Sequence, residues 1–167
     1  QVKRVTLELG GKSANIVFAD SDLEKAAATA PYGVFDNAGQ DCCARSRILV
    51  QASVFDRFMQ LLEPAVAAVR VEDPARDTAE MGPLISAAHR DSVRAYVPED
   101  APVAFRGHAP EGPGYWFAPT VLAPVAPGTP AFTEEIFGPV VAVTPFEDEA
   151  DAVRLANATD YGLSGSI

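Results

Sequence analysis

Two adjacent cysteines carry the strongest potential for covalent chemistry in this sequence. Cys42 and Cys43 follow a loop that contains Gly39. The thiolate is the reactive form of cysteine, and a helix N-terminus or an electropositive pocket lowers the thiol pKa from about 8.5. We therefore expect a lowered pKa at the reactive thiol. The alternative is that Cys42 is a small, buried apolar residue without chemistry.

Two glutamates lie in short motifs, and the first of them suits proton transfer. Glu8 lies in the run LELGGKS at residues 7–13, and Glu135 lies in the run EEIFGP at residues 134–139. A thiol nucleophile needs a partner that manages protons and water, and a partly buried glutamate can act as that base. A carboxylate also accepts hydrogen bonds from a sugar diol.

The two histidines give no sign of a metal centre. His89 is expected on a helix and His108 in a loop. Neither pairs with a carboxylate or with the cysteines at metal-ligand spacing. We expect no metal, and we expect both cysteines to be free thiols in a reducing compartment, because adjacent cysteines rarely form a structural disulfide.

The elements that position these side chains alternate between strands and helices. Apolar runs predict strands at residues 5–9, 15–18, 48–50, 103–105 and 140–143. Gly10 and Gly11 end the first strand and permit a tight turn and the close approach of another group. Strands that alternate with helices predict an α/β fold with a largely parallel sheet.

Helix signals lie between these strands. Ser21 begins a capping box, Pro31 should kink or restart that helix, and Ser53 should cap the next one. The second helix has an apolar face made of Phe55, Phe58, Met59, Leu62, Val66 and Val69. Further helices are expected at residues 87–96 and from the acidic residues 147–149, the latter with Ala150, Val153 and Ala156 facing inward.

Composition limits the possible partners. The 167 residues suffice for one domain, with 48% hydrophobic and 22% charged residues. A net charge of -10 disfavours nucleic acid and anionic membranes, which are polyanions. No apolar run reaches the roughly 20 residues that a bilayer requires. Without a visible leader we expect a cytoplasmic protein.

Taken together, these motifs resemble the catalytic domain of the NAD(P)-dependent aldehyde dehydrogenase superfamily. The resemblance extends from residues 5–8 to the run NATDYGL at residues 157–163. It implies a single catalytic domain over residues 1–167, with a parallel sheet flanked by helices. A cofactor-binding domain before Glu8 and an oligomerisation segment beyond Ile167 would be absent, and the full protein would form a homodimer or homotetramer.

The resemblance also implies roles for the reactive side chains. Cys42 would attack the aldehyde carbonyl to form a thiohemiacetal, which loses a hydride to the nicotinamide and becomes a thioester. Glu8 would then activate the water that hydrolyses the thioester. The spacing from Glu8 to Cys42 matches the family pattern, and it selects Cys42 rather than Cys43 as the nucleophile.

The cofactor implied by the resemblance is NAD or NADP, with NAD favoured. Glu135 would hold the hydroxyls of the nicotinamide ribose, and Phe137 would pack near the ring. Leu9 and Gly10 would bring backbone close to the nicotinamide.

Three residues near the nucleophile are candidates for the substrate pocket: Asp36, Asp41 and Cys43. In related enzymes the position of Asp36 lines the substrate tunnel, and Asp41 directly precedes the nucleophile. Carboxylates there would favour a cationic aldehyde such as an aminoaldehyde. The alternative is that both aspartates face solvent or cap the loop.

Three other functions remain open. The segment could be a truncated domain without activity of its own, because the cofactor-binding half would be absent. It could belong to a CoA-acylating aldehyde dehydrogenase, although such enzymes need no glutamate base, so that Glu8 favours hydrolysis. A cysteine hydrolase would need a histidine partner, and neither His89 nor His108 lies in a recognisable hydrolase context.

Overall fold

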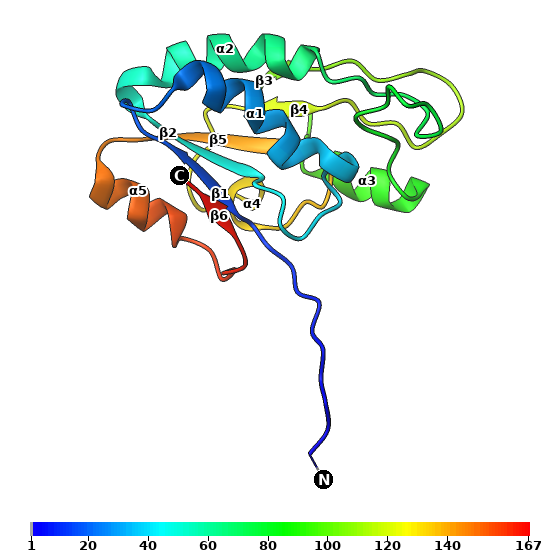
Figure 1. The fold of residues 1–167 in the computed structure, drawn as a ribbon, viewed down its shortest axis with the longest axis horizontal. Coiled ribbons are helices and arrows are strands. Elements are labelled where there is room, and N and C mark those ends of the chain that lie inside the picture. The colour runs from blue at the N-terminus through cyan, green and yellow to red at the C-terminus, as the bar shows by residue number, and fades with distance from the viewer. Residues whose placement is uncertain (1) are drawn as a thin grey trace.

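A six-stranded sheet forms the centre of the molecule (Figure 1). The computed structural model describes residues 2–167. The strand order is β3-β4-β5-β2-β1-β6, and every neighbouring pair is parallel except β3 with β4. The strands are β1 (Ala14–Val17), β2 (Arg47–Gln51), β3 (Val103–Arg106), β4 (Thr120–Leu122), β5 (Val140–Phe146) and β6 (Gly165–Ser166). The predicted α/β fold with a largely parallel sheet is confirmed.

Helices cover both faces of this sheet. They are α1 (Leu23–Phe35), α2 (Phe55–Ala67), α3 (Ala87–Ala95), α4 (Pro130–Thr133) and α5 (Glu149–Ala156), with short 3-10 turns η1 (Asp36–Gly39) and η2 (Ala52–Val54). In Figure 1, α1 and α2 lie side by side on one face, and α5 lies on the other. Across the sheet, the connection from β1 to β2 leads towards β3, whereas the connection from β5 to β6 leads towards the opposite side. Right-handed crossovers therefore place their helices on opposite faces.

The core lies where the central strands meet these helices. Ile48, Leu49 and Val50 of β2 are at most 1% exposed, and residues 140–143 of β5 are equally buried. Such continuous apolar runs are typical of parallel strands covered on both faces. The predicted apolar face of α2 is confirmed, because Phe58, Leu62 and Val66 are fully buried.

The strand predicted at residues 5–9 is wrong. Residues 2–13 form no strand, and the N-terminal segment runs away from the body of the molecule (Figure 1). Val5 and Leu7 are 74% and 69% exposed. An extended segment becomes a strand only by hydrogen bonding to a neighbouring strand, and no strand within residues 2–167 pairs with residues 5–9.

Two predicted helix caps are also wrong, and α1 does not restart at Pro31. Asp22, not Ser21, caps α1, and its side chain accepts a hydrogen bond from the Lys25 N–H at 3.0 Å. The Ser21 hydroxyl instead donates to the Phe18 carbonyl. Ser53 lies within η2, and α2 begins without a side-chain cap. Pro31 is accommodated inside a continuous α1.

The predicted inner face of α5 has the wrong phase. Ala152 and Leu155 are buried, whereas Ala150 is exposed and Val153 is 55% exposed. Arg47 of β2 fixes this orientation, because its guanidinium donates to the Leu155 and Ala156 carbonyls at 2.9 Å. These carbonyls belong to the last turn of the helix, where a cation is favoured.

Among residues 2–167, no helix combines the length and apolar character needed to cross a membrane.

Candidate active site

The three sequence motifs meet at one edge of the sheet. Residues 8–13 lead into β1, residues 39–44 precede β2, and residues 134–139 lead into β5. Since β1, β2 and β5 are parallel neighbours in register, their amino ends lie together. Open α/β sheets generally bind ligands at the carboxyl ends of their strands, so this cluster occupies the opposite edge.

The Cys42 thiol interacts with Glu8, its predicted partner. Hydrogen bonding to the Glu8 carboxylate, followed by partial burial and the neighbouring Cys43 thiol, raises the pKa of Cys42 to about 12. The expectation of a lowered thiol pKa is therefore wrong for this arrangement. Cys42 lies in a turn rather than at a helix N-terminus, and a negative carboxylate disfavours the thiolate.

Glu135 reaches across to the glycine pair that follows Glu8. Its Oε1 accepts a hydrogen bond from the Gly11 N–H at 2.8 Å. A Cβ at Gly10 would lie 2.5 Å from Glu135 Oε2, and a Cβ at Gly11 would overlap the Cys42 carbonyl oxygen. The predicted close approach at these glycines is confirmed, and it links Glu135 to the nucleophile loop through Gly11.

Lys12 is a buried cation that sequence reasoning missed. It is 1% exposed, and within the described chain its Nζ has no hydrogen-bond partner. Burial, and then the charge of Arg47, lower the pKa of Lys12 to about 7, while the carboxylates of Glu135 and Glu134 oppose that shift. The run GGKS predicts an exposed lysine in a loop, and no local sequence pattern indicates that this side chain is buried.

Phe137 lies beside α3, and its backbone is hydrogen-bonded to His89 of that helix. The Phe137 carbonyl accepts a hydrogen bond from His89 Nε2 at 2.7 Å, which requires a proton on that nitrogen. The two rings make an edge contact at 6.1 Å. Phe137 has φ +57° and is 38% exposed, so its ring remains available to a ligand. His89 lies on a helix as predicted.

A left-handed turn shapes the loop before Cys42. Asn37, Ala38 and Gly39 have φ of 50°, 57° and 69°. Gln40 then connects this loop to residue 85, because its Oε1 accepts a hydrogen bond from the Ile85 N–H at 2.9 Å. Gln40 was also missed, since its contact joins residues distant in sequence.

The three candidates for the substrate pocket differ in position. Asp36 is the exposed C-cap residue of α1. Asp41 is exposed at the nucleophile turn, and its Oδ1 accepts a hydrogen bond from the Cys43 N–H at 3.0 Å. Cys43 is exposed, with its Sγ 3.9 Å from Cys42 Sγ. Asp41 and Cys43 therefore lie at Cys42, and Asp41 helps to form the turn.

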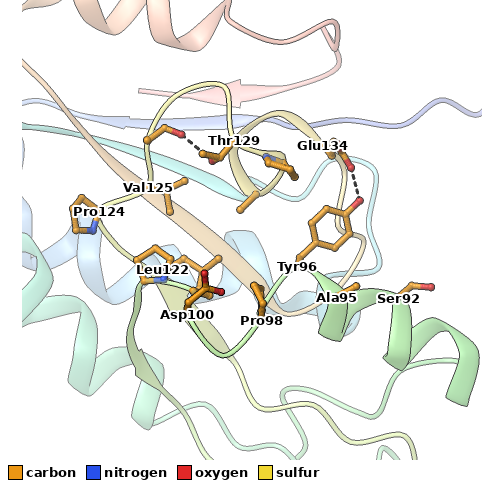
Figure 2. Close-up of a pocket in the computed structure, with 15 residues that line it drawn as sticks. Ser92, Ala95, Tyr96, Pro98, Asp100, Leu122, Pro124, Val125, Thr129 and Glu134 are labelled. Carbon is orange, nitrogen blue, oxygen red and sulfur yellow. Dashed lines mark hydrogen bonds between the residues drawn. The ribbon is translucent and has the colours of Figure 1, made fainter.

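A separate groove of about 900 Å³ lies between α3, α4 and β4 (Figure 2). Its walls are mostly apolar, and Tyr96 donates a hydrogen bond to Glu134 Oε2 at 2.7 Å within it. None of the predicted site residues lines this groove. A smaller hollow of about 330 Å³ is lined by Leu9 and Gly10 together with residues 160–163.

Comparisons with known proteins all relate this chain to aldehyde dehydrogenases. The model of the aldehyde dehydrogenase family matches residues 1–167. An aldehyde dehydrogenase of Emericella nidulans is 41% identical over 99% of this chain, and a betaine aldehyde dehydrogenase of Cereibacter sphaeroides is 42% identical over 99%. The chain spans only 34% and 35% of these relatives, about a third of their length.

Solved structures share the fold. An NAD-dependent aldehyde dehydrogenase from Sinorhizobium meliloti matches with a TM-score of 0.90 and 43% identity, over 98% of this chain and 34% of its own. The betaine aldehyde dehydrogenase of Staphylococcus aureus, solved in complex with NAD+, matches with a TM-score of 0.88 and 42% identity, over 95% of this chain and 33% of its own.

Proposed function

This chain belongs to the aldehyde dehydrogenase family, and from that premise we propose that it supplies the catalytic part of an enzyme that oxidises an aldehyde to a carboxylic acid with NAD(P)+. The observation that carries the proposal is the meeting of Cys42, Glu8 and Glu135 at one edge of the sheet. Cys42 is the proposed nucleophile, Glu8 the base and Glu135 a ligand of the cofactor.

Glu8 explains how a thiol with a raised pKa becomes reactive. In the proposed cycle the Cys42 proton passes to the Glu8 carboxylate as the sulfur attacks the aldehyde carbon, so that a free thiolate is not required beforehand. The resulting thiohemiacetal loses a hydride and becomes a thioester on Cys42. Glu8 then releases this proton to solvent and takes a second proton from water as the hydroxide attacks the thioester. It passes the second proton to the departing Cys42 sulfur, so that the acid leaves and the thiol is restored.

The residues around Gly10 fit a nicotinamide nucleotide. NAD(P)+, when bound, supplies the acceptor for the hydride. Glu135 Oε1 is held by the Gly11 N–H, which leaves Oε2 to accept hydrogen bonds from ribose hydroxyls. Leu9 and Gly10 line a hollow beside it, and a side chain at Gly10 would collide with Glu135. Phe137 supplies an exposed ring for packing. We favour NAD, because the relatives of known structure include an NAD+ complex and an NAD-dependent enzyme.

Substrate preference is proposed from Asp41. Its exposed carboxylate lies at the nucleophile, and two of the relatives above are named betaine aldehyde dehydrogenases. A carboxylate at this position stabilises a cationic aldehyde relative to a neutral one. In the protein that carries this chain, Asp41→Asn should lower kcat/KM for an aminoaldehyde relative to an alkyl aldehyde. An unchanged ratio would exclude Asp41 from selectivity.

The assembly and location of the protein are further proposals. We propose a homodimer or homotetramer in the cytoplasm, the assembly and location expected from the sequence. The oxidised product would leave as a free acid, because Glu8 beside Cys42 favours water over CoA as the group that cleaves the thioester.

The test is NADH formation by the protein that carries these residues. Alkyl, aromatic and amino aldehydes are compared with NAD+ and with NADP+, for the wild type and for Cys42→Ser. We expect turnover that falls at least about 10³-fold in the variant, since removal of a nucleophile eliminates the covalent route. Added CoA should not increase the rate. Absence of turnover in folded wild-type protein would favour the inactive-domain alternative, and strict dependence on CoA would favour the acylating one.

A further inference from the structure

The nucleophile turn concentrates three side chains that bind metals. Asp41, Cys42 and Cys43 each place one ligand atom so that all three atoms lie within 4.8 Å of one another. The two thiols are free, with their sulfurs 3.9 Å apart. Cys43 is exposed and Cys42 half-buried, so an ion from solvent can reach both sulfurs.

The distance between the sulfurs fits a shared metal ion better than a bond between them. In a tetrahedral site with Zn–S bonds of about 2.3 Å, two sulfurs lie about 3.8 Å apart, against 3.9 Å between Cys42 and Cys43. A disulfide would need about 2.0 Å between the sulfurs and Cα atoms at least about 4.4 Å apart. Consecutive residues have their Cα atoms only about 3.8 Å apart. Chelation therefore requires much less rearrangement than oxidation.

The types of ligand select a thiophilic ion. Two thiolates favour Zn²⁺ or Cd²⁺ over Mg²⁺ and Ca²⁺, which prefer oxygen ligands. Asp41 supplies a carboxylate whose Oδ1 already accepts a hydrogen bond from the Cys43 N–H at 3.0 Å, so that the ligand is partly oriented.

We propose that Asp41, Cys42 and Cys43 form an inhibitory binding site for a thiophilic divalent cation of the Zn²⁺ class. On binding, each thiol releases its proton to solvent, both sulfurs and the carboxylate coordinate the ion, and no redox step occurs. Binding requires only this geometry. Inhibition rests on the proposed function, because coordination withdraws charge from the Cys42 thiolate and places the ion beside the sulfur that must attack the aldehyde.

Cadmium is the probe for binding, since thiolate-to-cadmium coordination gives an ultraviolet charge-transfer band. Titration of the purified protein with Cd²⁺ should give one ion per chain. Cys42→Ser and Cys43→Ser should each eliminate the band or weaken affinity at least about 10-fold, and Asp41→Asn should weaken it by about 10-fold. Asp36→Asn is the matched control, because it removes an exposed carboxylate outside the cluster and should leave affinity unchanged. Circular dichroism checks that each variant is folded.

Competition with Zn²⁺ and turnover assays complete the test. Zn²⁺ should displace Cd²⁺, and it should inhibit aldehyde oxidation in the range of concentrations where it binds, reversibly with EDTA. A wild-type band in Cys43→Ser, or an equal loss in Asp36→Asn, would overturn the site. If the protein binds cadmium but oxidises no aldehyde, the proposed function fails while the metal site stands. Binding without inhibition of an active enzyme would overturn the inhibitory role alone.

Discussion

At the scale of single residues, one carboxylate determines the protonation state of Cys42. Glu8 is the main cause of the raised pKa of Cys42, so the thiol keeps its proton at neutral pH. The same interaction makes Glu8 a candidate acceptor for that proton. In the proposed cycle the thiol therefore keeps its proton until the sulfur attacks the aldehyde, which differs from the thiolate-based activation expected from the sequence.

Removal of the Glu8 charge tests whether Glu8 raises the pKa of Cys42. In a Cys43→Ser background, Glu8→Gln should lower the pKa of Cys42 towards the ordinary value of 9.0, because the principal cause of the shift is lost. The thiolate fraction at pH 8 then increases, and the midpoint of the pH profile for alkylation of Cys42 by iodoacetamide should move to lower pH by at least about one unit. The measurement is the alkylation rate as a function of pH.

The control for this experiment is Glu24→Gln, which removes a carboxylate exposed on α1. It should leave the alkylation profile unchanged. A midpoint that stays at the wild-type pH in Glu8→Gln would show that Glu8 does not raise the pKa of Cys42 and would contradict our interpretation.

At the scale of elements, the loops before the strands hold the site, and tight backbone contacts hold the loops. Gly39 has φ +69°, and a Cβ there would overlap the Gly138 carbonyl. The loop before β2 therefore packs directly on the loop before β5. This contact brings the nucleophile turn and the Glu135 segment together without any side chain between them.

Gly39→Ala should destabilise the protein by at least about 2 kcal/mol, because the left-handed conformation alone costs an L-residue about 1–2 kcal/mol and the collision adds to it. Gly128→Ala is the matched control, since Gly128 has φ +84° and a Cβ added there would have nothing within 4 Å. That variant should lose only the conformational part. Urea unfolding measures both, and equal losses would contradict the proposed packing.

The orientation of α5 gives a second test at this scale. Leu155 is 1% exposed and Val153 is 55% exposed. Leu155→Ala should lower the free energy of unfolding by about 2–5 kcal/mol through a cavity. Val153→Ala should change it by less than about 0.5 kcal/mol, as expected at a surface position. The opposite ranking in thermal or urea unfolding would restore the helix phase predicted from sequence.

At the scale of the whole molecule, folding buries a cation. Lys12 contacts two segments that are distant in sequence. Its carbonyl accepts a hydrogen bond from Arg47 Nε of β2 at 2.8 Å, and its amino group lies near Glu135. Burial brings the pKa of Lys12 from 10.5 to about 7. Between these values the unfolded chain holds a proton that the folded chain lacks, so the free energy of unfolding should increase with pH.

The comparison of wild type with Lys12→Met isolates this effect. From pH 7 to pH 9 the wild type should gain up to about 1.4 kcal/mol per pH unit relative to the variant, whose side chain does not titrate. Urea unfolding at several pH values measures the difference. Parallel curves for the two proteins would show that Lys12 keeps an ordinary pKa in the folded state.

The sequence by itself determined the alternation of strands and helices and the three chemical motifs. Local patterns suffice for these, because an apolar run such as residues 48–50 is buried in almost any parallel sheet. The glycines at residues 10 and 11 likewise predicted a close approach. The motif order then indicated the family, and the family comparison confirmed it.

Only the tertiary structure decided which groups meet. The contact of Glu135 with Gly11 spans most of the chain, and the burial of Lys12 depends on elements that no local window contains. The same holds for residues 5–9, whose alternation predicts a strand although no strand within the described residues pairs with them. Pairing, burial and charge environment are properties of neighbours in space, so a pattern read along the chain cannot specify them.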